Sequence, residues 1–411
     1  MIDFPASPTV GQIFTAGGVT WTWDGSKWTG NGLNVAYLPL IGGTMIGPLT
    51  LQGNPAGNLD AAPKQYVDVL SAGYPLGDNR IINGDMRIDQ RNGGASGTAI
   101  GIYTIDRWVY GGTVVNKGSW ARGGAGGQLT ALGFGNFLGF VSSSAYTPLA
   151  ADSFHFQQRI EADMVSDFCW GTPNAQAVTL SFWASCSLTG TFGGSIRNDS
   201  ATRSYPFTFN IPVASTWTKI VITIPGDTAG TWVMSGNGEA LRVYFDLGAG
   251  ANFRGTAGAW TAGDIRGVTG AVNIVGTNGA ALNITGVKLE LGGVATPFNR
   301  KTTQESLADC QRYCYRVGAP TLQSLGAGYS PTATLAGIIV SFPVTMRVNP
   351  TMSVSSGAGF TVNGAATTNV AAAANGVGGM QVNLTTSGQG AGAGVTANVT
   401  ANNWIGFDAE L

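Results

Sequence analysis

Short segments in which apolar and polar residues alternate, each bounded by Gly, Asn or Asp, constrain the fold of this chain most strongly. In the segment 178–184, Leu180 and Phe182 fall on one side of an extended backbone and Trp183 falls on the other. The same two-residue period recurs in 241–247 and around Ile220. This is the period of a β-strand with one buried face. Several such segments predict an antiparallel β-sandwich.

The composition excludes several classes of partner. Charged residues make up 10% of the chain and its formal net charge is -1, so no basic field attracts nucleic acid or anionic lipid. No apolar run reaches the roughly 18 residues of a transmembrane helix, so we expect no membrane insertion. The first residues lack the basic and apolar regions of a secretory signal, and we therefore expect synthesis and folding in the cytoplasm.

The cysteines and the single histidine offer little for a metal or cofactor. Four cysteines are too few for a disulfide framework, and we interpret Cys169, Cys186, Cys310 and Cys314 as reduced residues. The last two are four residues apart on a predicted helix and could face one ligand, but without a second pair or a nearby histidine we favour two buried small side chains. One histidine, His155, cannot form a zinc cluster, and a structural role is favoured. We expect no metal and no cofactor.

No catalytic residue is predicted, because neither a Gly-x-Ser-x-Gly elbow nor a Walker loop is present. The enzymatic alternative is a glycan depolymerase, whose chemistry requires only two carboxylates beside the glycosidic bond. Against it, the acids are scattered, Asp24 and Asp85 fit turns, and Glu305 fits a helix cap. The long parallel repeat expected of many such enzymes is also missing. A non-enzymatic protein is favoured.

The first 34 residues predict a small β-meander with a turn at Asp24-Gly25. Its aromatic residues are Phe4, Phe14, Trp21, Trp23 and Trp28. A module of this size buries little core by itself, since domains below about 40 residues usually need staples or partners. We therefore expect these aromatic residues to dock on another protein.

A short amphipathic helix is expected within residues 35–76. Tyr66, Val67 and Leu70 share one face at helical spacing. A helix of about ten residues does not persist alone in water, so its apolar face needs partner helices. Two further copies of the chain would supply them in a homotrimer.

A second helix is predicted within 301–318, where Thr302 and Glu305 form a capping box and Leu307, Cys310 and Cys314 share a stripe. Beyond it, 319–411 predicts a terminal β-sandwich with strand candidates at 337–344 and 380–384. We expect Trp404 to anchor the last strand in the core of this domain.

Four patches of sequence resemble bacteriophage tail-fibre and receptor-binding tail proteins. They are Phe4-Pro-Ala-Ser-Pro-Thr-Val-Gly-Gln-Ile-Phe with Trp21-Thr-Trp-Asp-Gly-Ser-Lys-Trp; Leu38-Pro-Leu-Ile-Gly-Gly-Thr-Met with Asp60-Ala-Ala-Pro-Lys-Gln-Tyr-Val-Asp; Asn79-Arg-Ile-Ile-Asn-Gly-Asp-Met with Tyr103-Thr-Ile-Asp-Arg-Trp; and Gly286-Val-Lys-Leu-Glu-Leu-Gly-Gly-Val-Ala-Thr-Pro-Phe-Asn-Arg. The third patch resembles the opening of a jelly roll, and the fourth resembles the junction between a jelly roll and a terminal domain.

The resemblance implies a mainly β chain with a virion-attachment module at 1–34, a shaft at 35–76, a jelly-roll β-sandwich at 77–300, a linking helix at 301–318 and a β-sandwich tip at 319–411. It implies a location in the virion and a tail or baseplate protein as the partner of the N-terminus. At the distal end it implies a bacterial surface glycan or an outer-membrane receptor. A bacterial lectin or adhesin is the remaining alternative, and the missing signal sequence argues against it.

Candidate glycan contacts lie at outward strand positions, because sugars are recognised by aromatic faces beside fixed polar groups. Trp183 is one candidate, and Arg242, Tyr244 and Asp246 form an outward row on another strand. In a trimer, the subunit interface is the favoured role for Trp183, because aromatic residues are enriched in interfaces.

Overall fold

The computed structural model describes residues 3–16, 19–31, 79–124, 126–318 and 321–411, and the chain divides into the units 1–72 and 73–411. The predicted helix with Tyr66, Val67 and Leu70 lies outside the described residues. No helix within the described ranges is long and apolar enough to cross a bilayer.

The N-terminal residues form an antiparallel meander of β1 (Ile13–Ala16), β2 (Val19–Trp23) and β3 (Trp28–Asn31), as predicted. Asp24 closes the second turn by accepting hydrogen bonds from the backbone N–H of Ser26 and Lys27, each at 2.9 Å. These bonds favour the ionised carboxylate and lower the pKa of Asp24 to about 2.

The predicted aromatic residues of this module pack on one another. Phe4 stacks on Trp28 with ring centroids 5.4 Å apart and meets the edge of Trp21 at 5.2 Å. Phe14 contacts Phe4 at 5.5 Å, and Trp23 contacts Trp28 at 5.7 Å. All five remain only half-buried, which leaves aromatic surface accessible within the unit.

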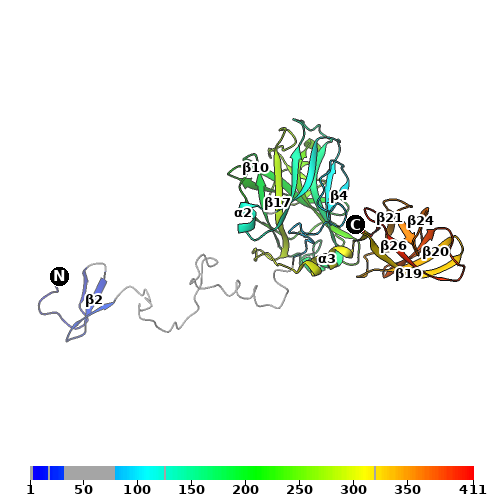
Figure 1. Ribbon diagram of the computed structural model, residues 1–411. Helices are drawn as coiled ribbons and strands as arrows, with labels where there is room; N and C mark the ends of the chain where they lie inside the picture. The colour runs from blue at the N-terminus through cyan, green and yellow to red at the C-terminus, as the bar shows by residue number, and fades with distance from the viewer. Residues whose placement is uncertain (1–2, 17–18, 32–78, 125, 319–320) are drawn as a thin grey trace. The chain divides into compact units, whose positions relative to one another are not determined.

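The residues from 79 to about 300 form a jelly-roll β-sandwich (Figure 1). Its larger sheet contains β15 (Thr261–Ala262), β11 (Arg203–Ile211), β10 (Gly190–Asn198), β13 (Glu239–Ala249), β8 (Ser153–Glu161), β5 (Trp108–Gly112) and β4 (Ile102–Ile105). Its smaller sheet contains β12 (Thr218–Ile224), β9 (Val178–Cys186), β17 (Ala281–Leu291), β7 (Asn136–Ser142) and β6 (Gly118–Gly124). Between strands lie α2 (Gly127–Ala131), η1 (Ala162–Phe168), η2 (Ala251–Phe253) and the parallel pair β14 (Arg254–Gly255) and β16 (Gly267–Val268).

The inner faces of the two sheets share one core. Phe182 on β9 meets Phe245 on β13 with ring centroids 4.9 Å apart, and Tyr110 on β5 meets Phe140 on β7 at 5.5 Å. The predicted inward residues of 178–184 and 241–247 are buried in this cluster. The alternation in the sequence therefore identified the buried faces correctly.

The helix α3 (Thr303–Gln311) begins with the predicted capping box. Thr302 Oγ1 accepts from the Glu305 backbone N–H at 3.2 Å, and Glu305 Oε2 accepts from the Thr302 backbone N–H at 2.7 Å. The predicted stripe through Cys314 is wrong, because the helix ends at Gln311 and Cys314 begins a strand. Backbone pairing with the last strand of the chain replaces the next helical turn.

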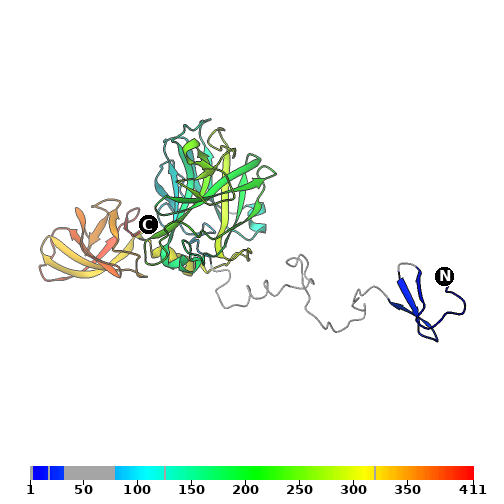
Figure 2. The same ribbon diagram turned by 180° about the vertical axis from the view of Figure 1, so that it is seen from behind.

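The last domain also has two sheets around one core, seen from behind in Figure 2. The smaller contains β18 (Cys314–Gly318), β27 (Trp404–Asp408) and β21 (Thr351–Val354). The larger contains β23 (Ala365–Ala366), β22 (Phe360–Val362), β26 (Gly394–Val399), β19 (Gln323–Thr332), β20 (Leu335–Ser341), β25 (Gly379–Thr385) and β24 (Asn369–Gly376).

Trp404 does not anchor the last strand in the core, contrary to expectation. Its ring is half-exposed and lies under the Arg316 guanidinium, whose carbon is 3.7 Å from the ring centroid. Ile405 and Phe407 of the same strand supply the buried contacts instead. A cation–π contact thus holds Trp404 at the first position of β27, the central strand of this sheet.

Candidate functional site

Three arginines lie side by side on the outer face of the larger jelly-roll sheet. Arg242 on β13 is directly opposite Arg159 on β8 and Arg197 on β10. Like charges at directly opposed positions destabilise a sheet. This row therefore needs compensating charges around it.

Two acids supply that compensation. Glu239, near the start of β13, accepts from Arg242 through both carboxylate oxygens, and its Oε2 is 3.6 Å from Arg159 Nε. Asp264, in the loop between β15 and β16, is 3.1 Å from Arg197 and 2.6 Å from Arg266. Carboxylates therefore bind Arg242, Arg197 and Arg266 closely, whereas Arg159 donates its hydrogen bond to the backbone oxygen of Leu411.

An aromatic and imidazole pair lies next to the arginine row. Tyr244 meets the edge of the His155 ring at a centroid distance of 4.9 Å. The His155 ring occupies the space where a Cβ at Gly111 would lie, so glycine is required at that position. Burial, together with the nearby charges of Arg266 and other arginines, holds the pKa of His155 well below its ordinary value. His155 is thus neutral at pH 7.

A groove of about 360 Å³ on the larger sheet is lined by Arg159, Arg242, Arg266, His155 and Tyr244 of this group, but not by Arg197. Strands β4, β5, β8 and β13 form its floor, and the loop that carries Arg266 and the chain segment at Glu410 also line it. Its polar and aromatic lining includes Tyr103, His155, Gln157, Arg159, Arg242, Tyr244, Arg266 and Glu410. The groove offers planar rings, guanidinium donors and an amide within one hollow.

The four residues predicted to contact a glycan do not lie at one site. Arg242 and Tyr244 line the groove, although Tyr244 is only 1% exposed. Asp246 does not belong to an exposed row as expected, because it is 2% exposed and packs under Gly267. Burial raises the pKa of Asp246 to about 7. Trp183 lies on the outer face of the other sheet and lines a different pocket.

Several groove residues were missed in the sequence. Gln157 and Arg159 alternate with the inward residues Phe156 and Ile160. That alternation could have identified both, since the same pattern identified Arg242. Arg266 lies in a loop, where no periodicity marks a side chain as functional.

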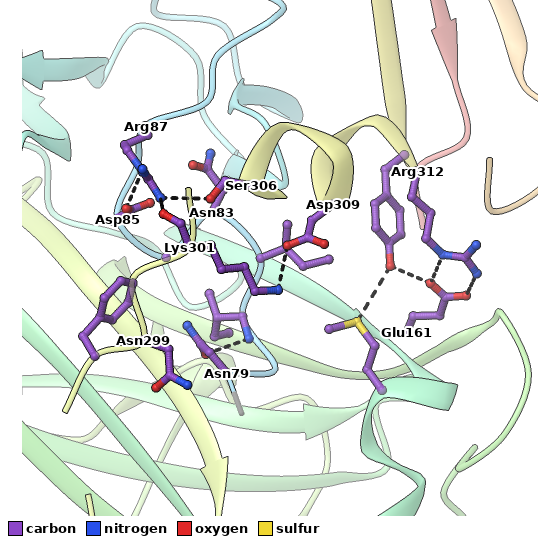
Figure 3. Close-up of a pocket in the computed structure, with 16 residues that line it drawn as sticks. Asn79, Asn83, Asp85, Arg87, Glu161, Asn299, Lys301, Ser306, Asp309 and Arg312 are labelled. Atoms are coloured by element: carbon purple, nitrogen blue, oxygen red, sulfur yellow. Dashed lines mark hydrogen bonds and ion pairs between the residues drawn. The ribbon is translucent and has the colours of Figure 1, made fainter. Parts of the chain in front are cut away.

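A second hollow of about 260 Å³ lies beside α3 (Figure 3). Its charged residues pair with one another: Arg87 with Asp85 at 2.6 Å, Lys301 with Asp309 at 2.8 Å, and Arg312 with Glu161 at 2.5 Å. Tyr313 also donates to Glu161 at 2.5 Å. The pair of Arg312 with Glu161 joins the end of the helix to the jelly roll, and the three pairs leave the hollow without an uncommitted charge for a ligand.

The cysteines and the residues that could bind a metal form no further site among the described residues. All four cysteines are free thiols, and Cys186, Cys310 and Cys314 are buried whereas Cys169 is half-buried. Among the residues that the structure describes, no group of three or more His, Cys, Asp or Glu is arranged to hold a metal ion.

Comparison with known proteins gives no family and only distant structural similarity. No protein-family model and no curated protein sequence matches the chain. Among solved structures, the enzymatically active domain of tailspike protein 4 from bacteriophage CBA120 is 17% identical, with a TM-score of 0.28, over 52% of this chain and 21% of that one. A putative sugar-binding protein from Bacteroides thetaiotaomicron is 12% identical, with a TM-score of 0.32, over 52% of this chain and 100% of that one.

A family 11 carbohydrate-binding module from a cellulosomal cellulase of Clostridium thermocellum is 9% identical, with a TM-score of 0.23, over 50% of this chain and 98% of that one. The chain thus spans about a fifth of the tailspike domain and nearly all of the two smaller proteins. At such low identities and TM-scores, these similarities assign no function to the chain.

Proposed function

We propose that this chain is a non-enzymatic subunit of a bacteriophage tail fibre that binds a saccharide of the bacterial surface in the groove on the larger jelly-roll sheet. The opposed pair Arg242 and Arg159, both of which line the groove, carries the proposal. Like charges at directly opposed positions cost stability, which Glu239 offsets. Both guanidinium groups still line the hollow, where they can donate hydrogen bonds to a ligand.

The chemistry of the groove suits a saccharide. Arginine forks donate paired hydrogen bonds to neighbouring oxygen atoms, and the half-buried ring of Tyr103, one face of which lies under the Arg91 guanidinium at 4.5 Å, would contact the C–H face of a sugar. Because Glu239 and Asp264 already hold the arginines, binding orders few side chains and loses little conformational entropy. The neutral His155 adds no further charge to be desolvated.

The virion end and the oligomeric state belong to the same proposal. The half-buried aromatic rings of residues 1–34 are the surface that we assign to a tail or baseplate protein. Two further copies would complete the fibre as a homotrimer made in the host cytoplasm. Sedimentation of the purified chain tests the trimer, and a stable monomer would contradict it.

The location in the virion has a direct test. Phage particles labelled with an antibody against residues 321–411 are expected to show the label at the outer ends of tail fibres in electron micrographs. Label absent from the tail would refute the fibre assignment. Incubation of the fibre with host polysaccharide should release no new reducing ends, and their appearance would instead support the depolymerase.

A further inference from the structure

The pocket beside Trp183 is a second hollow, on the outer face of the smaller jelly-roll sheet. Its volume is about 290 Å³, and its lining contains Trp183, Lys219 and Arg300 but no acidic residue. Lys219 on β12 is directly opposite Trp183 on β9, so an aromatic face and a cation adjoin in the sheet register. This hollow differs in charge from the groove on the larger sheet, where acids hold the arginines.

One wall of the hollow is a strap formed by residues 296–300. Lys288 and Glu290 are adjacent outward positions of β17, lie 3.2 Å apart, and have fully buried side chains. Lys288 Nζ donates to Pro297 O at 2.9 Å, and Glu290 Oε1 accepts from the Thr296 backbone N–H at 2.8 Å. The buried pair therefore fixes the strap across the sheet.

The strap places Arg300 at the hollow without an acidic partner. The Arg300 guanidinium carbon is 4.5 Å from the centroid of Phe134, and Phe298 of the strap meets the edge of the same ring at 5.4 Å. Within the described ranges, neither Arg300 nor Lys219 forms an ion pair, and both are exposed. The charge of Arg300 counteracts the rise in the pKa of Asp85 that burial causes. The ion-pair partner of Asp85, however, is Arg87, at 2.6 Å. Arg300 Nη2 donates to Leu132 O at 3.5 Å, and its other donors and the Lys219 ammonium can bind an anionic ligand.

We propose that this hollow binds a sugar carboxylate, as carried by an acidic monosaccharide unit of a surface polysaccharide. The pyranose ring would lie against Trp183, and its carboxylate would accept hydrogen bonds from Arg300 and Lys219. A guanidinium fork matches the two oxygens of a carboxylate, and an aromatic face matches the apolar face of a sugar ring. The inference stands apart from the groove on the larger sheet, because the two sites occupy opposite faces of the sandwich.

A second copy of the chain is the competing occupant, since an outward tryptophan also suits a subunit interface. The charges favour the saccharide. An interface between identical copies has to neutralise Lys219 and Arg300, and the hollow itself supplies no acid for that purpose. The oligomeric state of a Trp183 variant separates the two.

The test is calorimetric titration of the full chain with oligosaccharides that contain uronate or sialate units, and with the same oligosaccharides after reduction of their carboxylates to hydroxymethyl groups. We expect binding of at least one acidic oligosaccharide that weakens with added salt, and at least tenfold weaker binding of its reduced counterpart. Arg300→Met and Trp183→Ala should each weaken binding of the acidic form at least tenfold. Lys117→Ala, which removes a cation that lines neither hollow, should leave it unchanged.

Three outcomes would overturn the inference: no acidic oligosaccharide binds, the reduced forms bind equally well, or Arg300→Met binds like the parent chain. A change of sedimentation coefficient in Trp183→Ala, with saccharide binding intact, would assign the hollow to a subunit interface. Arg300→Met keeps the volume of an exposed side chain and should fold normally. The groove on the larger sheet is tested separately, by titration of Arg266→Ala with neutral saccharide. The result of that titration does not bear on the hollow beside Trp183.

Discussion

Arg107, in the turn between β4 and β5, forms a buried ion pair with Glu410, which follows the last strand of the chain. Arg91 also contacts Glu410 and Asp408, each at 3.0 Å. Arg347 of the last domain donates to the backbone oxygen of Ala409 at 2.7 Å. Arginines of the jelly roll and an arginine of the last domain therefore both hold the residues at the end of β27. Because Glu410 lines the groove on the larger sheet, the last domain contributes to that site.

Glu410→Gln tests this connection. Glu410 has a 6% exposed side chain, and its neutralisation leaves Arg107, with a 1% exposed side chain, without a counter-charge. Removing one partner of a buried pair costs about 3–5 kcal/mol. We expect a lower urea midpoint for the transition that reports on the jelly roll. Asp309→Asn is the control, because the exposed pair of Asp309 with Lys301 is worth less than about 1 kcal/mol. Equal midpoints for the two variants would contradict the connection.

Asp246 should make stability depend on pH. Its pKa in the folded state is about 7, above the ordinary 3.8, so the folded chain binds this proton more tightly than the unfolded chain. The contribution to stability is complete below about pH 4 and is lost as the pH rises through 7. Asp246→Asn removes this loss and keeps an oxygen for the Gly248 N–H, which donates at 2.8 Å.

Between pH 4 and pH 8, the parent chain is expected to lose stability relative to Asp246→Asn by on the order of 2–4 kcal/mol. Denaturant titrations of both proteins at several pH values measure the difference, in which the other titrating groups cancel. A difference that does not change with pH would show that Asp246 is ionised throughout.

The strap predicts a double-mutant effect. Lys288→Met leaves the buried Glu290 carboxylate without its cation and should cost about 3–5 kcal/mol in unfolding free energy. Adding Glu290→Leu should recover part of that loss, because an apolar pair avoids the buried charge. The two single variants and the double variant, compared by chemical unfolding, give the coupling energy. Strictly additive effects would show that the residues do not act as a pair.

The capping box predicts a smaller local effect. Thr302→Ala removes the acceptor of the Glu305 N–H and should destabilise the chain by about 1 kcal/mol. Thr302→Ser retains the hydroxyl and is the matched control. Thermal melts in which Ala and Ser behave identically would show that the cap contributes nothing.

The sequence predicted the structure correctly where burial of one strand face imposes a two-residue period, and where a turn or cap depends on neighbouring residues. The inward residues of β9 and β13, the Asp24 turn and the α3 cap were all predicted, because each depends on residues close in sequence. The end of α3 was not, since Cys314 pairs with β27, almost a hundred residues further along the chain. Pairing between distant strands leaves no mark in a local pattern.

The groove was predicted only in part for the same reason. Arg242 and Tyr244 were identified by alternation on β13, but their partners come from other strands and from a loop. The burial of Asp246 depends on Gly267, and no feature near Asp246 in the sequence indicates that cover. Trp183 was correctly placed outward, yet its position on the other sheet follows only from the strand order.

The central claim is that the groove on the larger sheet binds a saccharide of the host surface. Arg266→Ala is the most direct probe, because Asp264 keeps its contact with Arg197 at 3.1 Å and the groove stays folded. The measurement is calorimetric titration of the parent chain, Arg266→Ala and the control Lys117→Ala with neutral oligosaccharides from bacterial surface polysaccharides. The account predicts binding to the parent and control chains, and at least tenfold weaker binding to Arg266→Ala. Equal affinities for all three chains, or no binding to the parent chain, would contradict it.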